Sequence, residues 1–314
     1  MFKVAIIGAG IVSKRHVDAC NVNPDTQLCA VVDLVEEKAR EAAAPYGAAV
    51  YTDYLQMLDA EKPDAVVINL PHGLHESCAV ACAQRGIHAL LEKPMSVSWE
   101  SCQRINAAFA ESGALLQIGH PQRYLPYNRK AREIIESGEL GEIVLINEVR
   151  AVNYFVPTRP RWFLKKELAG GGIWMNFGAH SLDKLCYLTG SKVKSVTGKC
   201  TYENKECDVD GSAQVLAHME NGVTAAISIC GYNVKPREES LIFLTKGSLC
   251  ISRGKVVVTK DGVDEEPSLE GYPAPFQAQF DDFVQGIKDG KILCNDGYYG
   301  ADIIRHVESV WHNN

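Results

Sequence analysis

The sequence lacks the long apolar run that a membrane-spanning helix requires. No stretch of its 314 residues approaches the roughly 18 consecutive apolar residues of such a helix, so no membrane partner is expected. Blocks of basic residues are also missing, because the charges are scattered and the formal net charge is −7. An acidic chain without a basic patch is poorly suited to nucleic acid or to anionic membranes. We therefore expect neither as a partner.

Cysteine is plentiful, but the spacings of a disulfide framework or of a metal site are missing. The 11 cysteines are odd in number, are spread singly, and several lie in apolar runs, such as Cys29, Cys230 and Cys250. Cys78 and Cys82 are four residues apart on an expected helix, with no CxxC pair beside them. We expect reduced thiols that act as small hydrophobic side chains, and no metal site. The chain also enters an apolar strand at once, which leaves no room for a signal peptide, so a cytoplasmic location is expected.

The first residues combine a buried strand with a glycine-rich turn. Val4-Ala5-Ile6-Ile7 is an apolar, β-branched run that leads into Gly8-Ala9-Gly10-Ile11-Val12-Ser13. This is G-x-G-x-x-G with serine in the third place. Such a turn needs a glycine where it is tight and another where the backbone approaches a pyrophosphate, and the next helix directs its N–H groups at the phosphates. The motif predicts cofactor contacts by Gly8, Gly10, Ile11 and Val12; an ordinary glycine-rich turn is the alternative.

A second apolar run, Leu28–Val32, ends in Asp33. An acidic residue about 20 positions after the glycines is suited to hydrogen-bond the adenosine ribose hydroxyls. Leu34 follows, and no arginine adjoins it to receive a 2′-phosphate. We therefore expect NAD rather than NADP as the cofactor. A surface aspartate that merely ends a strand is the alternative.

Apolar strands alternate with helix-like segments up to residue 120, which predicts βαβ units and a parallel sheet. Ligands of such sheets lie beyond the carboxyl ends of the strands. The strand candidates 65–69 and 88–91 lead into two polar segments of this kind. The residues expected beside the cofactor are Asn69, Leu70, Pro71, Glu92 and Lys93. His75 is expected to structure its turn or to contact the cofactor, and a solvated loop lysine is the alternative for Lys93.

After Gly119 the pattern changes to longer strands joined by short turns. Strand candidates lie at 142–149, 193–200, 213–219, 224–230, 240–244, 248–252 and 255–260. Hairpin spacing of this kind predicts an antiparallel sheet. The expected fold class is α/β: a Rossmann domain with a doubly wound parallel sheet over 1–120, then an α+β domain with an open, mostly antiparallel sheet over 121–314. The second domain is expected to bind substrate and to form oligomer contacts.

A second polar constellation follows the glycine hinge Gly170-Gly171-Gly172. Asn176, His180 and Asp183 are spaced i, i+4 and i+7, so a helix would carry them on one face together with Tyr187. A polar face of this kind suits the wall of a cleft, where Asp183 or a backbone carbonyl could fix the tautomer of His180. A hydrogen-bonded structural histidine is the alternative.

These motifs together resemble the glucose–fructose oxidoreductase/inositol dehydrogenase (Gfo/Idh/MocA) family. The matching pieces occur in order over roughly residues 1–190: the glycine turn, Asp33, 69–75, Glu92-Lys93-Pro94, the segment with Arg123, and 170–183. The resemblance implies that Lys93 and His180 are the catalytic pair and that the second sheet supports a homo-oligomer, either a dimer or a tetramer. Many polyol dehydrogenases of this family carry aspartate where this chain has Asn176. Asparagine cannot take up a proton, but it can orient a substrate hydroxyl.

The expected function is hydride transfer between NAD and a secondary alcohol of a sugar, polyol or sugar derivative. His180 would accept the hydroxyl proton, and Lys93 would stabilise the developing alkoxide. Substrate contacts are predicted for Arg123, Trp162, Asn176 and Asp183, with a plain core tryptophan as the alternative for Trp162. Two other functions remain open: a redox-neutral enzyme that retains its NAD while processing a glycoside, and a non-catalytic sensor of NAD or sugar.

Overall fold

The computed structural model of the protein describes residues 1–292 and 294–312. The packing of Cα atoms divides the chain into two units. Unit 1 comprises Met1–Pro121 and Ala274–Asp302. Unit 2 comprises Gln122–Pro273 and the described residues from Ile303 onward.

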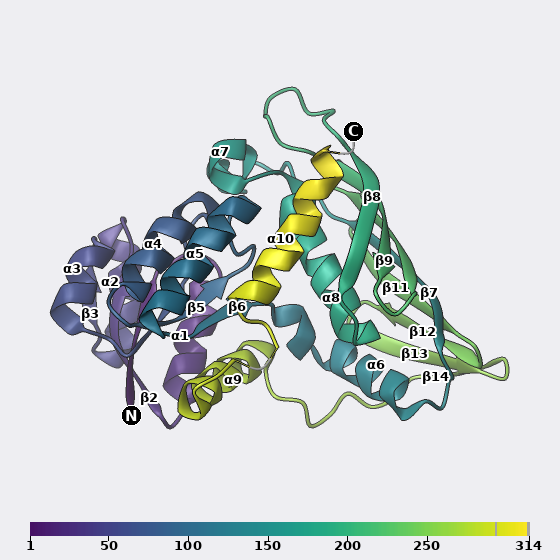
Figure 1. Cartoon of the computed structure of the whole chain (residues 1–314), viewed down its shortest axis with the longest axis horizontal. Coiled ribbons are helices and arrows are strands. Elements are labelled where there is room, and N and C mark those ends of the chain that lie inside the picture. The colour runs from purple at the N-terminus through teal and green to yellow at the C-terminus, as the bar shows by residue number, and fades with distance from the viewer. Residues whose placement is uncertain (293, 313–314) are drawn as a thin grey trace. The chain divides into compact units, whose positions relative to one another are not determined.

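Unit 1 is built on a six-stranded parallel sheet with the order β3-β2-β1-β4-β5-β6 (Figure 1). The chain builds outward from β1 in one direction and then returns to add β4 on the other side, which creates a topological switch point between β1 and β4. All four residues of β4 are fully buried, as expected for a strand that is covered on both faces. The strands are β1 (Phe2–Ile7), β2 (Thr26–Val32), β3 (Ala49–Tyr51), β4 (Ala65–Ile68), β5 (His88–Glu92) and β6 (Leu116–Gly119).

Helices cover both faces of this sheet, because right-handed crossovers on the two sides of β1 place their helices on opposite faces. Buried residues of α1, α2 and α9 form one core cluster with residues of β1, β2 and β4. The helices α3, α4 and α5 pack side by side, and α4 contacts β4 and β5. The bounds are α1 (Ser13–Val22), α2 (Glu36–Ala43), α3 (Tyr54–Glu61), α4 (His75–Ala83), α5 (Trp99–Ser112) and α9 (Pro275–Asp289), with short turns η1 (Ala44–Tyr46) and η2 (His72–Leu74).

The position of α9 differs from the sequence prediction, which assigned all of 121–314 to the second domain. In the structure, Ala274–Asp302 packs with unit 1. Phe280 and Phe283 of α9 are both 0% exposed and belong to the core cluster that also contains Val17 of α1. The amphipathic pattern of a helix shows that it has an apolar face, but not which sheet that face covers.

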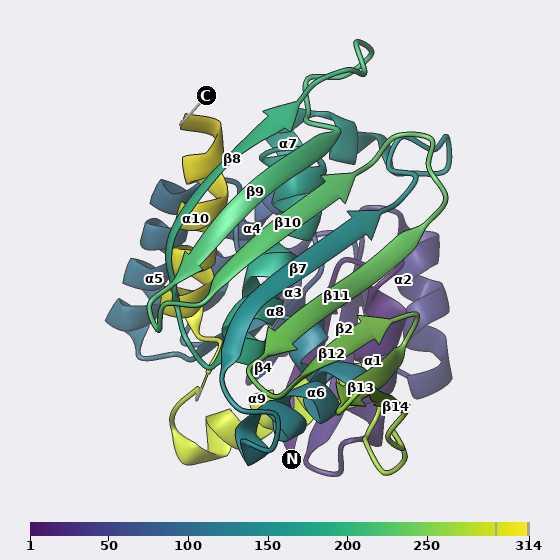
Figure 2. The same cartoon turned by 90° about the vertical axis from the view of Figure 1, so that its right-hand side faces the viewer.

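Unit 2 contains an eight-stranded mixed sheet with the order β14-β13-β12-β11-β7-β10-β9-β8 (Figure 2). Neighbouring strands are antiparallel except β7 and β10, which run parallel. Residues of β9 alternate between buried and more exposed positions, the pattern of a sheet with one covered face. The strands are β7 (Ile143–Ala151), β8 (Val193–Thr201), β9 (Ser212–Met219), β10 (Thr224–Cys230), β11 (Arg237–Leu244), β12 (Gly247–Ser252), β13 (Lys255–Lys260) and β14 (Val263–Glu265).

Helices of unit 2 lie on one face of this sheet. The helix α6 packs against α8 and against β12 and β13. Figure 2 shows the other face of the sheet, and no helix of the described part of unit 2 lies in front of it. The bounds are α6 (Pro126–Ser137), α7 (Lys166–Ala169), α8 (Ala179–Thr189) and α10 (Gly297–His312, which starts in unit 1), with the turns η3 (Pro121–Tyr124), η4 (Arg161–Leu164) and η5 (Trp174–Gly178).

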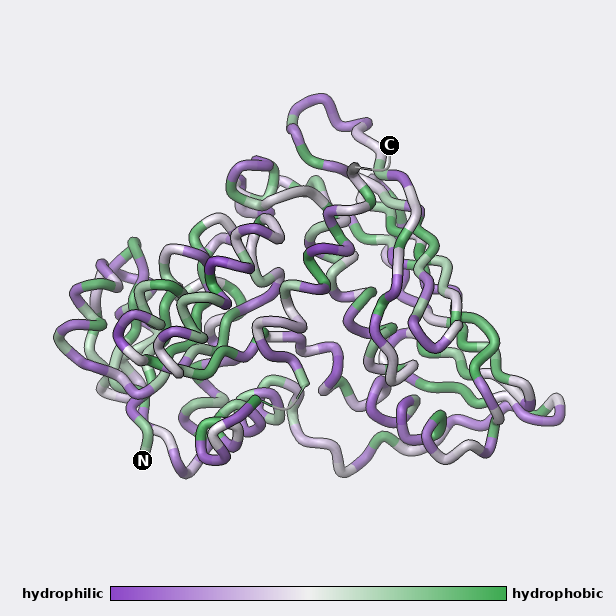
Figure 3. Tube along the Cα trace, in the orientation of Figure 1, coloured by the Kyte–Doolittle hydropathy of each residue, from purple (hydrophilic) through white to green (hydrophobic). Residues whose placement is uncertain are grey.

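The predicted fold class is confirmed: a parallel Rossmann-type sheet comes first and a mostly antiparallel sheet second. Figure 3 shows the loop between β8 and β9, at the top of the view, as mostly hydrophilic, in line with its sequence YENKECDVDG. The 11 cysteines are all free thiols, and six of them are buried. Among the described residues, no helix is both long and apolar enough to cross a membrane, and no group of three or more His, Cys, Asp or Glu side chains could hold a metal ion.

Candidate active site

The glycine turn after β1 lies against the end of β4. Gly8 has a φ of +95°, and a Cβ at this position would lie 2.6 Å from the carbonyl oxygen of Asn69. Only glycine combines this backbone conformation with so close an approach. By contrast, a Cβ on Gly10 would meet no atom within 4 Å in the described structure. Ser13, 2% exposed, donates a hydrogen bond from Oγ to the Gly10 carbonyl at 2.6 Å, so it suits the crowded third position of the motif.

Asp33 at the end of β2 ties the glycine turn to the next loop. Its Oδ2 accepts a hydrogen bond from the backbone N–H of Ala9 at 2.8 Å, and its Oδ1 accepts one from Val35 at 2.9 Å. These bonds hold the carboxylate at the carboxyl edge of the sheet. Leu34 beside it is 87% exposed.

His75 connects the loop after β4 with the loop after β5. Its Nε2 lies 2.9 Å from the carbonyl oxygen of Leu70, and its Nδ1 lies 3.0 Å from that of Pro94. A neutral imidazole can donate to only one of these oxygens. Burial lowers the pKa of His75, although the nearby carbonyl groups and Glu92 act in the opposite direction. The side chain thus structures its turn, as one of the two sequence interpretations held, and cofactor contact stays a prediction.

Lys93 follows β5 and lies next to a buried hydrogen bond between Glu92 and His16. Glu92, 9% exposed, receives a hydrogen bond from His16 of α1, with Nε2 and Oε1 2.7 Å apart. The backbone N–H of Lys93 donates to the other carboxylate oxygen at 3.2 Å. Burial disfavours the carboxylate, but His16 and Lys93 outweigh this effect and hold the pKa of Glu92 below its ordinary value. His16 was not predicted from the sequence, where it reads only as a polar residue in α1.

Asn69 ends β4 with an amide that no described residue satisfies. Neither its Oδ1 nor its Nδ2 has a hydrogen-bond partner, although both atoms are buried. An amide held in this way at a sheet edge is available to a polar ligand. Asn69, together with Gly8, Asp33 and Lys93, lies at the carboxyl edge of this sheet. Four of the predicted cofactor residues are therefore at one edge.

In unit 2 the polar helix begins with a wide turn rather than a regular α-helix. Residues Trp174–Gly178 form a π-turn, and α8 follows from Ala179. The interval from Asn176 to His180 therefore crosses from π to α geometry, and uniform α spacing does not hold there. Within α8 it does hold: Arg123 contacts both Asp183 and Tyr187. Such turns are frequent at functional sites.

Asp210, which the sequence analysis missed, holds the start of this turn. Its Oδ1 accepts a hydrogen bond from Gly172 N–H at 2.8 Å, and its Oδ2 accepts one from Trp174 N–H at 2.7 Å. Gly172 packs so closely that a Cβ would lie 1.9 Å from the Asp210 carbonyl oxygen. Burial raises the pKa of Asp210, and these two hydrogen bonds oppose that change.

Asn176 and His180 lie beside an aromatic cluster. Asn176 is 8% and His180 is 9% exposed. The rings of Tyr154 and Phe177 have centroids 6.4 Å apart, and those of Phe177 and His180 are also 6.4 Å apart. Burial raises the pKa of the Tyr154 phenol well above its ordinary value, while Arg159 and the neighbouring Asn176 amide act in the opposite direction.

Arg123 and Trp162, two predicted substrate contacts, have different surroundings. Arg123 pairs with Asp183, with Nε and Oδ1 2.6 Å apart and side chains 10% and 0% exposed. Its charge is therefore already neutralised within unit 2. Trp162 is half-buried and stacks on Phe163, with ring centroids 3.7 Å apart, so it is not a plain core tryptophan. Substrate contact by either residue stays a prediction.

Both units of the chain match models of known protein families. Residues 2–120 match the model described as "Oxidoreductase family, NAD-binding Rossmann fold", and residues 128–250 match the "GFO/IDH/MocA C-terminal domain". The chain belongs to the GFO/IDH/MocA oxidoreductase family. The resemblance seen in the sequence and the prediction of an oxidoreductase acting on CH–OH groups are thereby confirmed.

Several members of the GFO/IDH/MocA family are similar to this chain. The rhizopine catabolism protein MocA of Rhizobium meliloti is 26% identical over 92% of this chain and 87% of its own length. D-glucoside 3-dehydrogenase of Escherichia coli is 34% identical, but the match covers 62% of this chain and only 56% of that enzyme. The structure of an aldose-aldose oxidoreductase from Caulobacter crescentus superposes with a TM-score of 0.90 at 23% identity, covering 99% of this chain and 97% of that one. This last likeness shows the fold alone.

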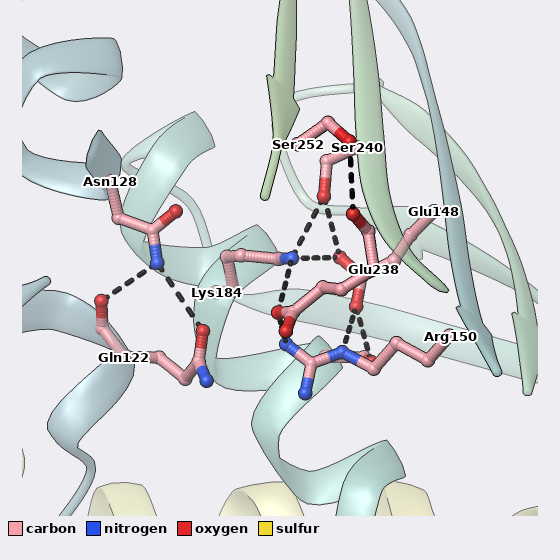
Figure 4. A network of polar contacts seen from close by, with 9 residues as sticks. Gln122, Asn128, Glu148, Arg150, Lys184, Glu238, Ser240 and Ser252 are labelled. Atoms are coloured by element: carbon pink, nitrogen blue, oxygen red, sulfur yellow. Dashed lines mark hydrogen bonds and ion pairs between the residues drawn. The ribbon is translucent and has the colours of Figure 1, made fainter. Parts of the chain in front are cut away.

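A buried charge network beneath α8 is a further feature of this GFO/IDH/MocA protein that sequence reasoning missed (Figure 4). Lys184 of α8 lies 2.8 Å from Glu148 of β7 and donates to Ser240 of β11 at 2.8 Å. Ser181, next to His180, donates to the same glutamate at 2.5 Å. Arg150 bridges two carboxylates: its Nε lies 3.0 Å from Oε1 of Glu148, and a terminal nitrogen lies 2.7 Å from Oε1 of Glu238.

This network anchors the helix that carries His180 to the centre of the second sheet. Glu148 and Lys184 are each 1% exposed. Burial disfavours the carboxylate of Glu148, but Lys184 and Arg150 outweigh this effect and lower its pKa to about 2. In the sequence, β7 shows only a partial alternation of apolar and polar residues. Glu148 and Lys184 are 36 residues apart, and no local pattern links them.

Proposed function

We propose that the protein is an NAD-dependent oxidoreductase that transfers a hydride between the nicotinamide and a secondary alcohol of a sugar, polyol or sugar derivative. The observation that carries this proposal is the position of Lys93. It follows β5 at the same sheet edge as the glycine turn, and the buried Glu92–His16 pair holds its backbone.

The residues at this edge fit a dinucleotide. Gly10 leaves its surroundings open, Asn69 presents an unsatisfied amide, and Asp33 presents a carboxylate held by two backbone N–H groups. Bound NAD would accept or donate a hydride. We infer NAD rather than NADP because Asp33 and the exposed Leu34 offer no cation for a 2′-phosphate.

The roles of the chain's own residues follow from their chemistry. His180 accepts the proton of the substrate hydroxyl. Lys93 donates a hydrogen bond to the same oxygen and stabilises the charge that develops on it. Asn176 orients a neighbouring hydroxyl. The pairing of Lys93 with His180 is based on the family resemblance and on the order of the motifs along the chain.

The first experiment follows nicotinamide absorbance with NAD or NADP and a panel of polyols, free sugars, sugar acids, glycosides and nucleotide sugars. Product analysis is run on the same wells. NADH accumulation with one substrate class would support the proposal, and faster turnover with NAD than with NADP would support the cofactor assignment. A changed substrate without net NADH would instead indicate a redox-neutral cycle.

The catalytic assignment of Lys93 is tested by Lys93→Met. We expect turnover to fall by about two to four orders of magnitude, the range typical of losing one positioned proton-transfer or oxyanion-stabilising group, with NAD affinity largely retained. Lys38→Met, an exposed lysine on α2, is the matched control and should leave turnover unchanged. Near-normal turnover of Lys93→Met would refute the assignment.

We further propose a cytoplasmic homo-oligomer, dimeric or tetrameric, assembled through the uncovered face of the second sheet. Strand register places Leu145 opposite Phe243 on that face, and the two side chains are 36% and 41% exposed. Exposed apolar side chains grouped in this way are typical of an association surface. The free thiols are consistent with a reducing compartment. Light scattering of the purified protein tests the assembly, and a monomer at micromolar concentration would contradict it.

A further inference from the structure

The segment that joins β7 to α7 differs in charge from the rest of the chain. Although the chain carries a net charge of −7, residues 152–166 hold four cations and no acidic residue. Three of these cations are exposed to solvent: Arg161, Lys165 and Lys166. The fourth, Arg159, is half-buried and is therefore the one whose charge has lost part of its hydration.

Arg159 is held in a defined orientation by the residues around it. Its Nε donates a hydrogen bond to the backbone oxygen of Tyr154 at 2.5 Å. Its guanidinium carbon lies 4.0 Å from the centroid of the Tyr154 ring and 5.1 Å from that of Phe163. Because Nε is bonded to the Tyr154 carbonyl and the rings of Tyr154 and Phe163 lie against the guanidinium group, the edge formed by the two terminal nitrogens remains for another partner.

No carboxylate among residues 1–292 and 294–312 forms an ion pair with Arg159. Burial lowers the pKa of its guanidinium group, and only the Tyr154 phenol opposes this change. Arg123 provides the contrast, because Asp183 already neutralises it. A partly desolvated cation without a counter-charge is unfavourable unless an anion binds to it.

Arg159 also lies close to the polar residues of the candidate active site. It packs on Tyr154, whose phenol neighbours the amide of Asn176. Tyr154 contacts Phe177, which in turn contacts His180. All of these residues belong to unit 2, so a ligand bound at Arg159 would lie a few side chains away from His180.

We propose that Arg159 binds an anionic oxygen group of the substrate, so that the preferred substrates are acidic sugars rather than neutral polyols. A planar guanidinium with two free nitrogens on one edge matches the paired oxygens of a carboxylate or a phosphate. The carboxylate of a sugar acid and the phosphate of a sugar phosphate or nucleotide sugar share this chemistry. The inference is based on the proposed function, since it names the substrate class of that same site.

The test compares matched substrates with the full-length protein and NAD. Each neutral sugar is paired with its uronic acid and with its phosphorylated or nucleotide form, and kcat/KM is measured for each. We expect the anionic member of at least one pair to exceed the neutral member by about 30-fold or more, a typical effect of one charge-assisted bidentate contact. Preference for the uronic acid or for the phosphorylated form identifies the source of the anionic group.

Variants assign that preference to Arg159. Arg159→Gln should raise KM for the anionic substrate by about 30-fold or more and KM for the neutral partner by much less, and Arg159→Lys should restore part of the loss. Arg161→Gln removes the same charge from an exposed neighbour and should have little effect. Thermal unfolding of each variant shows whether it is folded. Equal preference for neutral and anionic substrates in wild type, or an unchanged preference in Arg159→Gln, would overturn the proposal.

Calorimetric titration separates this inference from the proposed oxidoreductase function. If no substrate yields NADH, the same uronic acids and sugar phosphates are titrated into wild type and into Arg159→Gln. Binding by wild type that is lost in Arg159→Gln would support an anion site even though the proposed reaction had failed. Absence of binding by wild type to every anionic sugar would refute the site.

Discussion

In unit 1 the residues at the sheet edge are held mainly by hydrogen bonds between side chains and backbone. In unit 2, by contrast, the helix that carries His180 is held by charged side chains from distant parts of the chain. Asp33 accepts hydrogen bonds from the N–H groups of Ala9 and Val35, and the two ring nitrogens of His75 lie within hydrogen-bond distance of carbonyl oxygens in two loops. In unit 2, Arg123 and Asp183 are 60 residues apart, and Arg150 and Glu238 are 88 residues apart.

The difference determines what a single substitution removes. A contact to the backbone depends on one side chain, because the backbone partner is present whatever the sequence. A buried ion pair depends on two side chains, and the loss of one leaves the other charged, buried and without a partner. The helix that carries His180 should therefore be more sensitive to substitution than the edge that carries Lys93.

The largest effect is expected for Glu148→Gln in the buried network of unit 2. The change leaves Lys184 and Arg150 without their shared carboxylate, and removal of one partner from a buried pair costs about 3–5 kcal/mol of unfolding free energy. Urea unfolding of wild type and variant measures this loss. Glu139→Gln, which removes an exposed partner of Lys260, is the control and should unfold like wild type.

A second substitution in the same network sharpens this result. Glu148→Gln combined with Lys184→Met removes the opposing charge together with the carboxylate. The double variant should be less destabilised than the sum of the two single variants, because each single variant leaves a buried charge. Strict additivity of the two effects would show that Glu148 and Lys184 do not act as a pair.

Acid should weaken unit 2 through the same carboxylate. The ordinary pKa of Glu148 is 4.5, and in the folded protein it is lowered to about 2. The unfolded chain therefore binds the proton first, so this stability is complete above pH 4.5 and is lost as the pH falls toward 2. The contribution is on the order of 3 kcal/mol. Between pH 4.5 and 2, the free energy of unfolding should fall more steeply with pH for wild type than for Glu148→Gln. Parallel curves would show that Glu148 is not the carboxylate responsible.

The same contrast explains how much of the molecule the sequence could predict. The strands of unit 1 contain short apolar runs, such as Ala65–Ile68, and because all of them run parallel, their carboxyl ends lie at one edge of the sheet. The edge residues lie within a few positions of those ends. Local sequence therefore predicted the parallel sheet of unit 1 and the candidate cofactor residues at its edge, but not that α9 packs with this unit.

The features that were missed depend on three-dimensional contacts or on weak local signals. The strand β14 is three exposed residues, Val263–Glu265, with no apolar pattern. The π-turn at Trp174–Gly178 has the composition of an ordinary helix, and its cap, Asp210, comes 36 residues after Trp174. Arg159 did have a signal that the description of the charges as scattered overlooked, because residues 152–166 hold four cations and no acidic residue. Only the structure separates Arg159 from its exposed neighbours.

The smallest effect is expected at the hydrogen bond between His16 and Glu92, which joins α1 to the edge of unit 1. His16→Leu removes the donor to Glu92, which still accepts the N–H of Lys93, so we expect a loss of about 1–3 kcal/mol. His16→Gln keeps an N–H donor and should recover part of the loss, as urea unfolding would show. Because Glu92 retains a backbone partner, the effect should remain below that of Glu148→Gln. If His16→Leu and Glu148→Gln lost equal amounts of unfolding free energy, backbone contacts would not protect the edge of unit 1. The contrast between the two units would then fail.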